Sequence, residues 1–273
     1  MSGWEFWAVA AVAAVMTGMG KGGLPVVGAL VVPFMSLVIS PVVAAGLMLP
    51  VYVLSDMFGL YAYRKEFNAR VLAIAAIGMT AGVGLGWATA SMVSEAWVTV
   101  LVGVISVAFA LNQILRRAAV AEPRRAEVAP GLFWCSIAGF TSFVSHTGGP
   151  PYQVWTLPLG MKKAVFAGTS TIAFAYVNAV KLIPYFFLGQ LNFANLKIAA
   201  LLVPVAAALV FFGVWLVKVL PEKLFFRIVT WSLLLIGVEL VWKGLRAALG
   251  PGATGRPEAP CNRKISGSEL VSL

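Results

Sequence analysis

The sequence predicts an all-α, polytopic helical membrane protein with two inverted repeats, each a glycine-broken helical hairpin followed by three transmembrane helices. Three observations lead to this fold class: the composition, the long apolar runs and a repeated glycine-rich stretch. Hydrophobic residues make up 60% of the 273 residues, charged residues make up 11%, and the mean hydropathy is +0.92. A soluble protein has about a quarter of its residues charged. Most of this surface must therefore face lipid.

Six apolar segments are long enough to cross a bilayer, which takes about 20 residues of helix. They cover residues 42–63, 71–90, 96–115, 164–188, 198–217 and 224–245. We expect all six to be helices, because a helix satisfies its own backbone hydrogen bonds within lipid. Segment 164–188 carries a lysine, Lys181, and segment 224–245 carries Arg227 and Glu239.

Two further regions are uncharged but interrupted. Residues 22–55 run for 34 residues without a charge and contain four prolines, and residues 131–161 run for 31 and are broken near position 148. Each region is too long for one span and too interrupted for two. We therefore expect a helix, a glycine-rich break and a short second helix, which either re-enters or crosses the membrane fully.

The two interrupted regions belong to an internal repeat. Gly22-Gly23 matches Gly148-Gly149, and Pro25 matches Pro151, at a shift of 126 residues. The order of segments also repeats, because a broken hairpin and three long helices occur twice. We therefore divide the chain into a first repeat (1–117), a basic linker (118–130), a second repeat (131–249) and a polar, disordered tail (250–273).

The number of crossings decides the symmetry of the repeats. Each repeat crosses the membrane an odd number of times, whichever way its hairpin is built, so the second repeat is inverted. Basic clusters at 64–70, 116–125, 162–163 and 218–223 then fall on one side, which the positive-inside rule makes cytoplasmic. Both termini are expected outside. The first residues lack a basic n-region, so we expect the first helix to be retained.

Several functional classes are excluded or disfavoured. The net charge of +10 comes from short clusters between apolar runs, whereas a nucleic-acid reader presents its basic residues on a solvated face. The two cysteines form no CxxC pair, and one histidine cannot build a multi-histidine metal site. No constellation suits catalysis. We expect no cofactor, no metal, no nucleic acid and no enzymatic activity.

The breaks themselves suggest a function. A helix that ends inside a membrane leaves backbone groups that must be satisfied, and a helix beginning there points a positive dipole end at its surroundings. Paired broken helices in inverted repeats are typical of secondary transporters. The sequence therefore predicts a site for a small anion between the two breaks.

These residues carry a resemblance to a known family. Gly20-Lys21-Gly22-Gly23 opens the first unit, Thr147-Gly148-Gly149-Pro150-Pro151 opens the second, and each unit ends in three apolar helices. In this the chain resembles the TauE/SafE sulfite exporters over residues 4–249. The resemblance implies export of small sulfur-containing anions, such as sulfite or sulfoacetate, across a bacterial inner membrane. The sequence departs from the family's glycine triplets at Lys21 and at His146-Thr147.

The residues at the breaks are the first candidates for substrate binding. Lys21, Gly22 and Gly23 stand at the first break, and Ser145, His146, Thr147, Gly148 and Gly149 stand at the second. A cation within the membrane is functional by default, although Lys21 could also snorkel from the end of a complete span. The single histidine could donate to an oxyanion, carry a proton or serve as a structural hydrogen bonder.

Three polar residues within the spans complete the candidate set. Asp56 and Lys181 align under a shift of about 125, so a mutual ion pair between the repeats is the simplest expectation for them. The alternative is that Asp56 takes a coupling proton while Lys181 faces the anion. Asn178, one turn before Lys181, is expected to line the same path.

The sequence leaves two alternatives open. The same helix dipoles could serve an anion channel, or a transporter of a small non-sulfur carboxylate. The expected partners are a small anion, the lipid bilayer and protons as coupling ions. Away from the site, Glu239 and Lys243 are spaced to pair along one helix.

Overall fold

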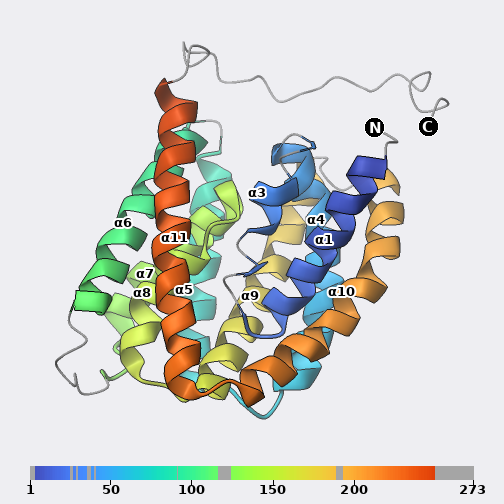
Figure 1. Cartoon of the computed structure of the whole chain (residues 1–273). Coiled ribbons are helices and arrows are strands. Elements are labelled where there is room, and N and C mark those ends of the chain that lie inside the picture. The colour runs from blue at the N-terminus through green and yellow to red at the C-terminus, as the bar shows by residue number, and fades with distance from the viewer. Residues whose placement is uncertain are drawn as a thin grey trace, which may run out of the picture.

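The chain folds into a bundle of helices (Figure 1). The computed structural model describes residues 4–24, 27–28, 30–35, 38–39, 41–90, 92–115, 124–188 and 193–249, and every regular element in them is a helix. The elements are α1 (Trp4–Lys21), α3 (Val31–Met35), α4 (Pro41–Tyr63), α5 (Ala69–Ala88), α6 (Glu95–Leu115), α7 (Val128–Ser145), α8 (Gly149–Thr156), η2 (Leu157–Leu159), α9 (Lys163–Phe187), α10 (Phe193–Val219) and α11 (Glu222–Leu249). The all-α class is confirmed.

The helices have the length and surface of membrane spans. Six of them, α5, α6, α7, α9, α10 and α11, are long and apolar enough to cross a membrane. Helix α4 has 23 residues, which gives a length of about 34 Å. Large apolar side chains point outward, including Leu101, Leu201 and Leu235, which are 60%, 64% and 68% exposed. The chain is a multi-pass membrane protein.

Both interrupted regions contain the expected helix, break and short helix. Helix α1 ends at Lys21 and a helix resumes in α3, while α7 ends at Ser145 and α8 follows with η2. The Arg124 amide, before α7, donates to the carbonyl of Pro158 in η2 at 3.0 Å, so this hairpin returns to the end at which it begins. Helix α7 begins at Val128, within the range 118–130 expected as a linker. Pro25, residues 116–123 and the tail 250–273 lie outside the described residues.

The basic segments meet at one end of the bundle, as the positive-inside pattern requires. The Lys163 ammonium donates to the carbonyls of Lys218, at 2.7 Å, and Leu220, and the Arg70 guanidinium donates to the Ala126 carbonyl at 3.1 Å. In Figure 1 the α4–α5 and α10–α11 connections lie at the lower end, whereas α1 begins and α11 ends at the upper end. The two termini of the helical bundle therefore share the side opposite the basic clusters.

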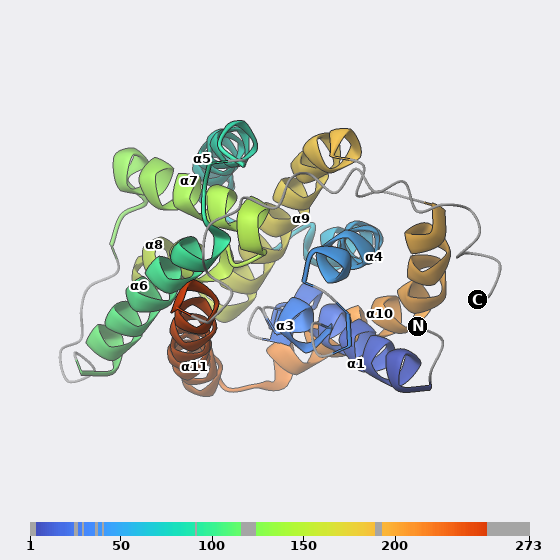
Figure 2. The same ribbon diagram turned by 90° about the horizontal axis from the view of Figure 1, so that it is seen from above.

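The two halves of the chain exchange helices. Helix α1 packs on α10 and α7 packs on α5, so the first helix of each half lies against a helix of the other half. Helices α4 and α9 pack on each other at the centre, and α6 packs on α11 (Figure 2). This reciprocal pattern is the packing expected of two related repeats. Their inversion stays a prediction.

Glycines bring the exchanged helices into close contact. A Cβ atom built on Gly18 of α1 would lie 2.2 Å from the Ala206 carbonyl oxygen of α10. One built on Gly139 of α7 would lie 2.2 Å from the Met79 carbonyl oxygen of α5. Small residues let transmembrane backbones approach in this way. Each broken helix is therefore held against an unbroken one.

Candidate functional site: a cavity between two broken helices

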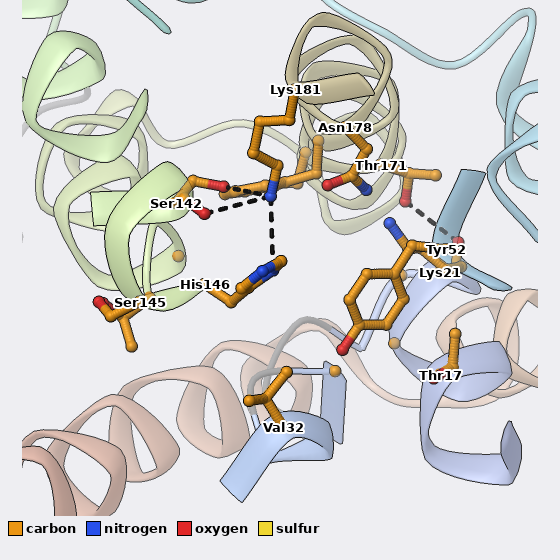
Figure 3. A pocket seen from close by; sticks show the side chains of 17 residues that line it. Thr17, Lys21, Val32, Tyr52, Ser142, Ser145, His146, Thr171, Asn178 and Lys181 are labelled. Atoms are coloured by element: carbon orange, nitrogen blue, oxygen red, sulfur yellow. Dashed lines mark hydrogen bonds between the residues drawn. The ribbon is translucent and has the colours of Figure 1, made fainter. Parts of the chain in front are cut away.

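A cavity of about 110 Å³ lies between the two broken helices (Figure 3). Its walls come from α1, the residues after it, α4, the α7–α8 break and one face of α9. A cavity needs about 10–15 Å³ to hold one water molecule. This cavity therefore has room for a small oxyanion together with water.

Helix α9 shows that the two breaks lie at different depths. The Thr171 hydroxyl donates to the carbonyl of Lys21, at the first break, at 3.3 Å. The Lys181 ammonium donates to the carbonyl of Ser142, just before the second break, at 3.1 Å. Positions 171 and 181 are ten residues apart, or about 15 Å along a helix. The cavity thus extends along α9 between two staggered helix ends.

The first break is a glycine helix cap. Gly23 has a φ of 104°, and the Leu24 amide donates to the Met19 carbonyl at 3.2 Å, as in a Schellman motif. Only glycine adopts this backbone conformation without strain. The Tyr63 hydroxyl donates to the Gly22 carbonyl at 2.7 Å. The carbonyl groups freed by the helix end are thus satisfied inside the protein.

The lysine of the first break has its own counter-ion. The Lys21 ammonium lies 2.6 Å from the Asp56 carboxylate and 5.1 Å from the centre of the Tyr52 ring. The Asn178 amide donates to the other carboxylate oxygen at 2.8 Å. The expected ion pair between Asp56 and Lys181 is therefore wrong. The alignment matched positions in the sequence, but the helix end carries Lys21 to the carboxylate instead.

The second break uses a different residue at its helix end. His146 has a φ of 55° and is the single non-glycine residue with positive φ among the described residues. The Thr147 amide donates to the Thr141 carbonyl at 3.2 Å, and the hydroxyls of Ser145 and Thr147 lie 2.6 Å apart. Left-handed conformations disfavour residues with a Cβ atom, although histidine tolerates them better than most. The structure therefore keeps a strained residue here.

Lys181 is the second cation of the cavity and is buried, with 1% of its surface exposed. Its ammonium donates to the carbonyl and hydroxyl oxygens of Ser142, both at 3.1 Å. Among the described residues no carboxylate lies within 4.0 Å of it. A buried charge requires compensation, and two neutral oxygens supply only part of it. Lys181 is thus the cation in this cavity that is open to an anion.

The His146 ring connects Lys181 to the protein behind it. Its Nδ1 atom lies 3.5 Å from the Lys181 ammonium, and its Nε2 atom lies 2.7 Å from the Tyr185 hydroxyl. An ammonium can only donate, so Nδ1 faces it as the acceptor and Nε2 carries the proton. The Tyr185 hydroxyl in turn donates to the Phe143 carbonyl at 3.4 Å. The side chain at the strained position is therefore held between Lys181 and Tyr185.

The start of α8 supplies fewer backbone donors than a typical helix end. Gly149 opens the helix, but Pro150 and Pro151 have no N–H group, and the Tyr152 amide already bonds to the Gly148 carbonyl. The first turn therefore offers the Gly149 amide and the helix dipole to the cavity. The positive character of the cavity comes mainly from side chains.

The sequence profile of the family described as "Sulfite exporter TauE/SafE" matches residues 6–240. This chain belongs to the TauE/SafE family. No curated protein and no solved structure matches it significantly. The family implies a membrane exporter of sulfite or related sulfur anions rather than an enzyme. Within the described part of this TauE/SafE protein, no group of three or more His, Cys, Asp or Glu could hold a metal ion.

Most candidate residues of this TauE/SafE protein surround the cavity. Eight of them line it: Lys21, Gly23, Ser145, His146, Thr147, Gly149, Asn178 and Lys181. Two do not. Gly22 packs against Val210 and Gly213 of α10, and Gly148 packs against Ala138 of α7. Their role is to admit a neighbouring helix. Asp56 stands behind Lys21 as its counter-ion.

The remaining lining residues of this family member were missed in the sequence. They are Thr17, Gly20, Gly28, Val32, Tyr52, Ser142, Ser170, Thr171 and Phe174. Helical spacing from the known candidates would have found several of them. Thr17 is one turn before Lys21, and Tyr52 is one turn before Asp56. Thr171 and Phe174 share a face of α9 with Asn178. Nothing in the sequence indicates Gly28 or Val32.

Proposed function

We propose that this TauE/SafE protein is a secondary transporter that exports small sulfur-containing anions, sulfite or an organosulfonate, across a bacterial inner membrane. The anion binds in the cavity between the two broken helices and is released by alternating access. Family membership supports the substrate class. The buried Lys181 ammonium, which faces the cavity without a carboxylate partner among the described residues, is the observation that carries the proposal.

The donors around Lys181 suit an oxyanion. The hydroxyls of Ser145 and Thr147 also line the cavity, and the Gly149 amide begins a helix beside them. Charge-assisted hydrogen bonds to several oxygens are about twice as strong as neutral ones. A sulfur oxyanion accepts more of these bonds at once than a carboxylate does. We therefore favour sulfite or a sulfonate over a small carboxylate.

The staggered hairpins support alternating access. The second hairpin enters from the end of the bundle that carries the basic clusters, and α1 enters from the opposite end. A binding site reached by two oppositely directed hairpins can open toward either side when one packed unit moves against the other. The close pairs α1–α10 and α5–α7 are suitable rigid units, because glycine contacts hold each pair together.

Anion-dependent thermal stabilisation of the purified protein tests the site. A ligand that binds the folded state raises its melting temperature by mass action. We expect stabilisation by sulfite or by an organosulfonate such as methanesulfonate, which Lys181→Gln abolishes. Lys197→Gln, the same change at an exposed position of α10, should leave it intact. Stabilisation by acetate or malonate alone would overturn the substrate assignment.

Counterflow in proteoliposomes tests the transport mechanism. Proteoliposomes loaded with unlabelled sulfite accumulate labelled sulfite transiently, because a carrier exchanges an internal anion for an external one. Uptake should also saturate with concentration. Flux that neither saturates nor shows counterflow would indicate the channel alternative and overturn alternating access, while leaving the binding site in place.

A further inference from the structure

The cavity carries one uncompensated positive charge. Among the described residues that line it, the ionisable ones besides the Tyr52 phenol are Lys21, His146 and Lys181. Asp56 lies directly behind Lys21. With both lysines protonated, Asp56 ionised and the imidazole neutral, these groups leave a single net positive charge. The charge that a bound anion has to balance is therefore determined by Lys21, Lys181 and Asp56.

We propose that Asp56 determines the charge of the transported anion, and that the cavity selects monoanions such as organosulfonates or hydrogensulfite over dianions. This inference rests on the proposed function. One negative charge neutralises the cavity, whereas a second would remain uncompensated in a medium that screens it poorly. Asp56 is thus a specificity-determining residue, although it contacts Lys21 rather than the cavity itself.

The surroundings of Asp56 hold its charge in place. The residue is 2% exposed, and both carboxylate oxygens are engaged, one by Lys21 at 2.6 Å and one by the Asn178 amide at 2.8 Å. Lys21 in turn sits at the end of α1, which glycine contacts hold against α10. The ammonium of Lys21 is therefore not free to neutralise a second negative charge without leaving its carboxylate.

Part of the cavity wall is apolar, which suits a substrate that has one charged end and one apolar end. Val32, Phe174 and the Tyr52 ring line the cavity together with the polar residues. A dianion with oxygens on all sides would leave some of them against apolar surface, where they lose hydration without gaining a donor. An organosulfonate places its hydrocarbon part there and its three oxygens toward Lys181.

Two probes of equal shape test the charge rule. Methanesulfonate and sulfate are both tetrahedral sulfur compounds of similar size, with one and two negative charges. Their dissociation constants are measured at pH 6, where both probes keep these charges and lysine side chains hold their protons more firmly than at pH 8. The readout is the change in the ratio of the two constants from the wild type to each variant, in which the difference in hydration between the probes cancels. We expect Asp56→Asn to shift this ratio toward sulfate by about tenfold or more.

A series of variants separates charge from structure. The double variant Lys21→Gln/Asp56→Asn restores the net charge of the wild type, so it should restore the wild-type ratio. Lys21→Gln alone leaves no net charge and should weaken both probes. Glu239→Gln makes the same acid-to-amide change in the remote Glu239–Lys243 pair and should leave the ratio unchanged.

The outcomes distinguish this inference from the proposed function. If the wild type binds no sulfur anion, including sulfite and sulfoacetate, the proposed function fails. If it binds them but the ratio does not change in Asp56→Asn, only the charge rule fails. The rule is also overturned if the double variant retains the ratio of Asp56→Asn, because net charge would then not be the cause.

Discussion

The two breaks end similar helices beside the same cavity, but they differ in backbone and in charge. The first ends with a glycine at positive φ and places a lysine 2.6 Å from a carboxylate. The second ends with a histidine at positive φ and lies beside Lys181, which has no carboxylate partner among the described residues. The first break is thus electrically balanced within the protein. The second is left open to a ligand.

The backbone conformations of the two breaks lead to the same conclusion, that the second break belongs to the binding site. A glycine at a helix end is the residue that this conformation favours, so Gly23 needs no functional explanation. A histidine there is strained relative to glycine, by on the order of 1 kcal/mol. Strain of this kind persists where the surroundings hold it and is common at functional sites. His146 is held by Lys181 and Tyr185 at the wall of the cavity.

The largest effect is expected where both breaks are alike, at the glycines that hold the broken helices. Gly18→Ala and Gly139→Ala each place a methyl group 2.2 Å from a backbone oxygen of the neighbouring helix. Relieving this overlap should destabilise each variant by about 3 kcal/mol. Thermal unfolding in detergent measures it. A large effect in one variant and none in the other would show that the two hairpins are not held equivalently.

The next largest effect separates the first break from the second. Gly23→Ala combines a φ of 104° with a Cβ atom 2.4 Å from the Tyr63 hydroxyl, so we expect a loss of about 2–3 kcal/mol. Gly84→Ala is the control, because nothing lies within 4 Å of the added methyl group. Alanine also has a higher helix propensity than glycine, so this variant should not lose stability. Equal melting temperatures for these two variants would contradict the need for glycine at the first break.

His146→Asn should affect binding more than folding. Asparagine tolerates the left-handed conformation, so the melting temperature without ligand should fall less than in Gly23→Ala. The ring that joins Lys181 to Tyr185 is lost, and the affinity for sulfite should fall about tenfold. Titration of the melting temperature with sulfite measures both quantities. An unchanged affinity would make His146 a structural residue only.

The smallest effect is expected at the support of the first break. Tyr63→Phe removes the hydroxyl that donates to the Gly22 carbonyl at 2.7 Å and leaves that carbonyl unsatisfied. The expected loss is about 1 kcal/mol, without a change in anion affinity. The same thermal titration checks this, with Tyr61→Phe on the exposed face of α4 as the control. A change in affinity would link the first break to the ligand directly.

The sequence by itself determined the fold class and the neighbourhood of the site. Apolar runs of about 20 residues require helices in lipid, and each of the six expected segments forms one helix. The glycine-rich stretches at 22–23 and 148–149 marked the breaks, and the two lysines marked the polar path. The spacing of Glu239 and Lys243 also predicted their pair, at 2.7 Å. These features depend only on local composition and on the spacing of residues along the sequence.

Only the tertiary structure decided which groups meet. Asp56 pairs with Lys21 instead of Lys181, because α1 ends beside the C-terminal half of α4. Gly22 and Gly148 face neighbouring helices rather than the cavity, because a helix end turns successive residues in different directions. The stagger of the two breaks along α9 and the exchange of helices between the halves are contacts between distant segments. Such contacts leave no periodic trace in a sequence, and they decide which lysine remains open to an anion.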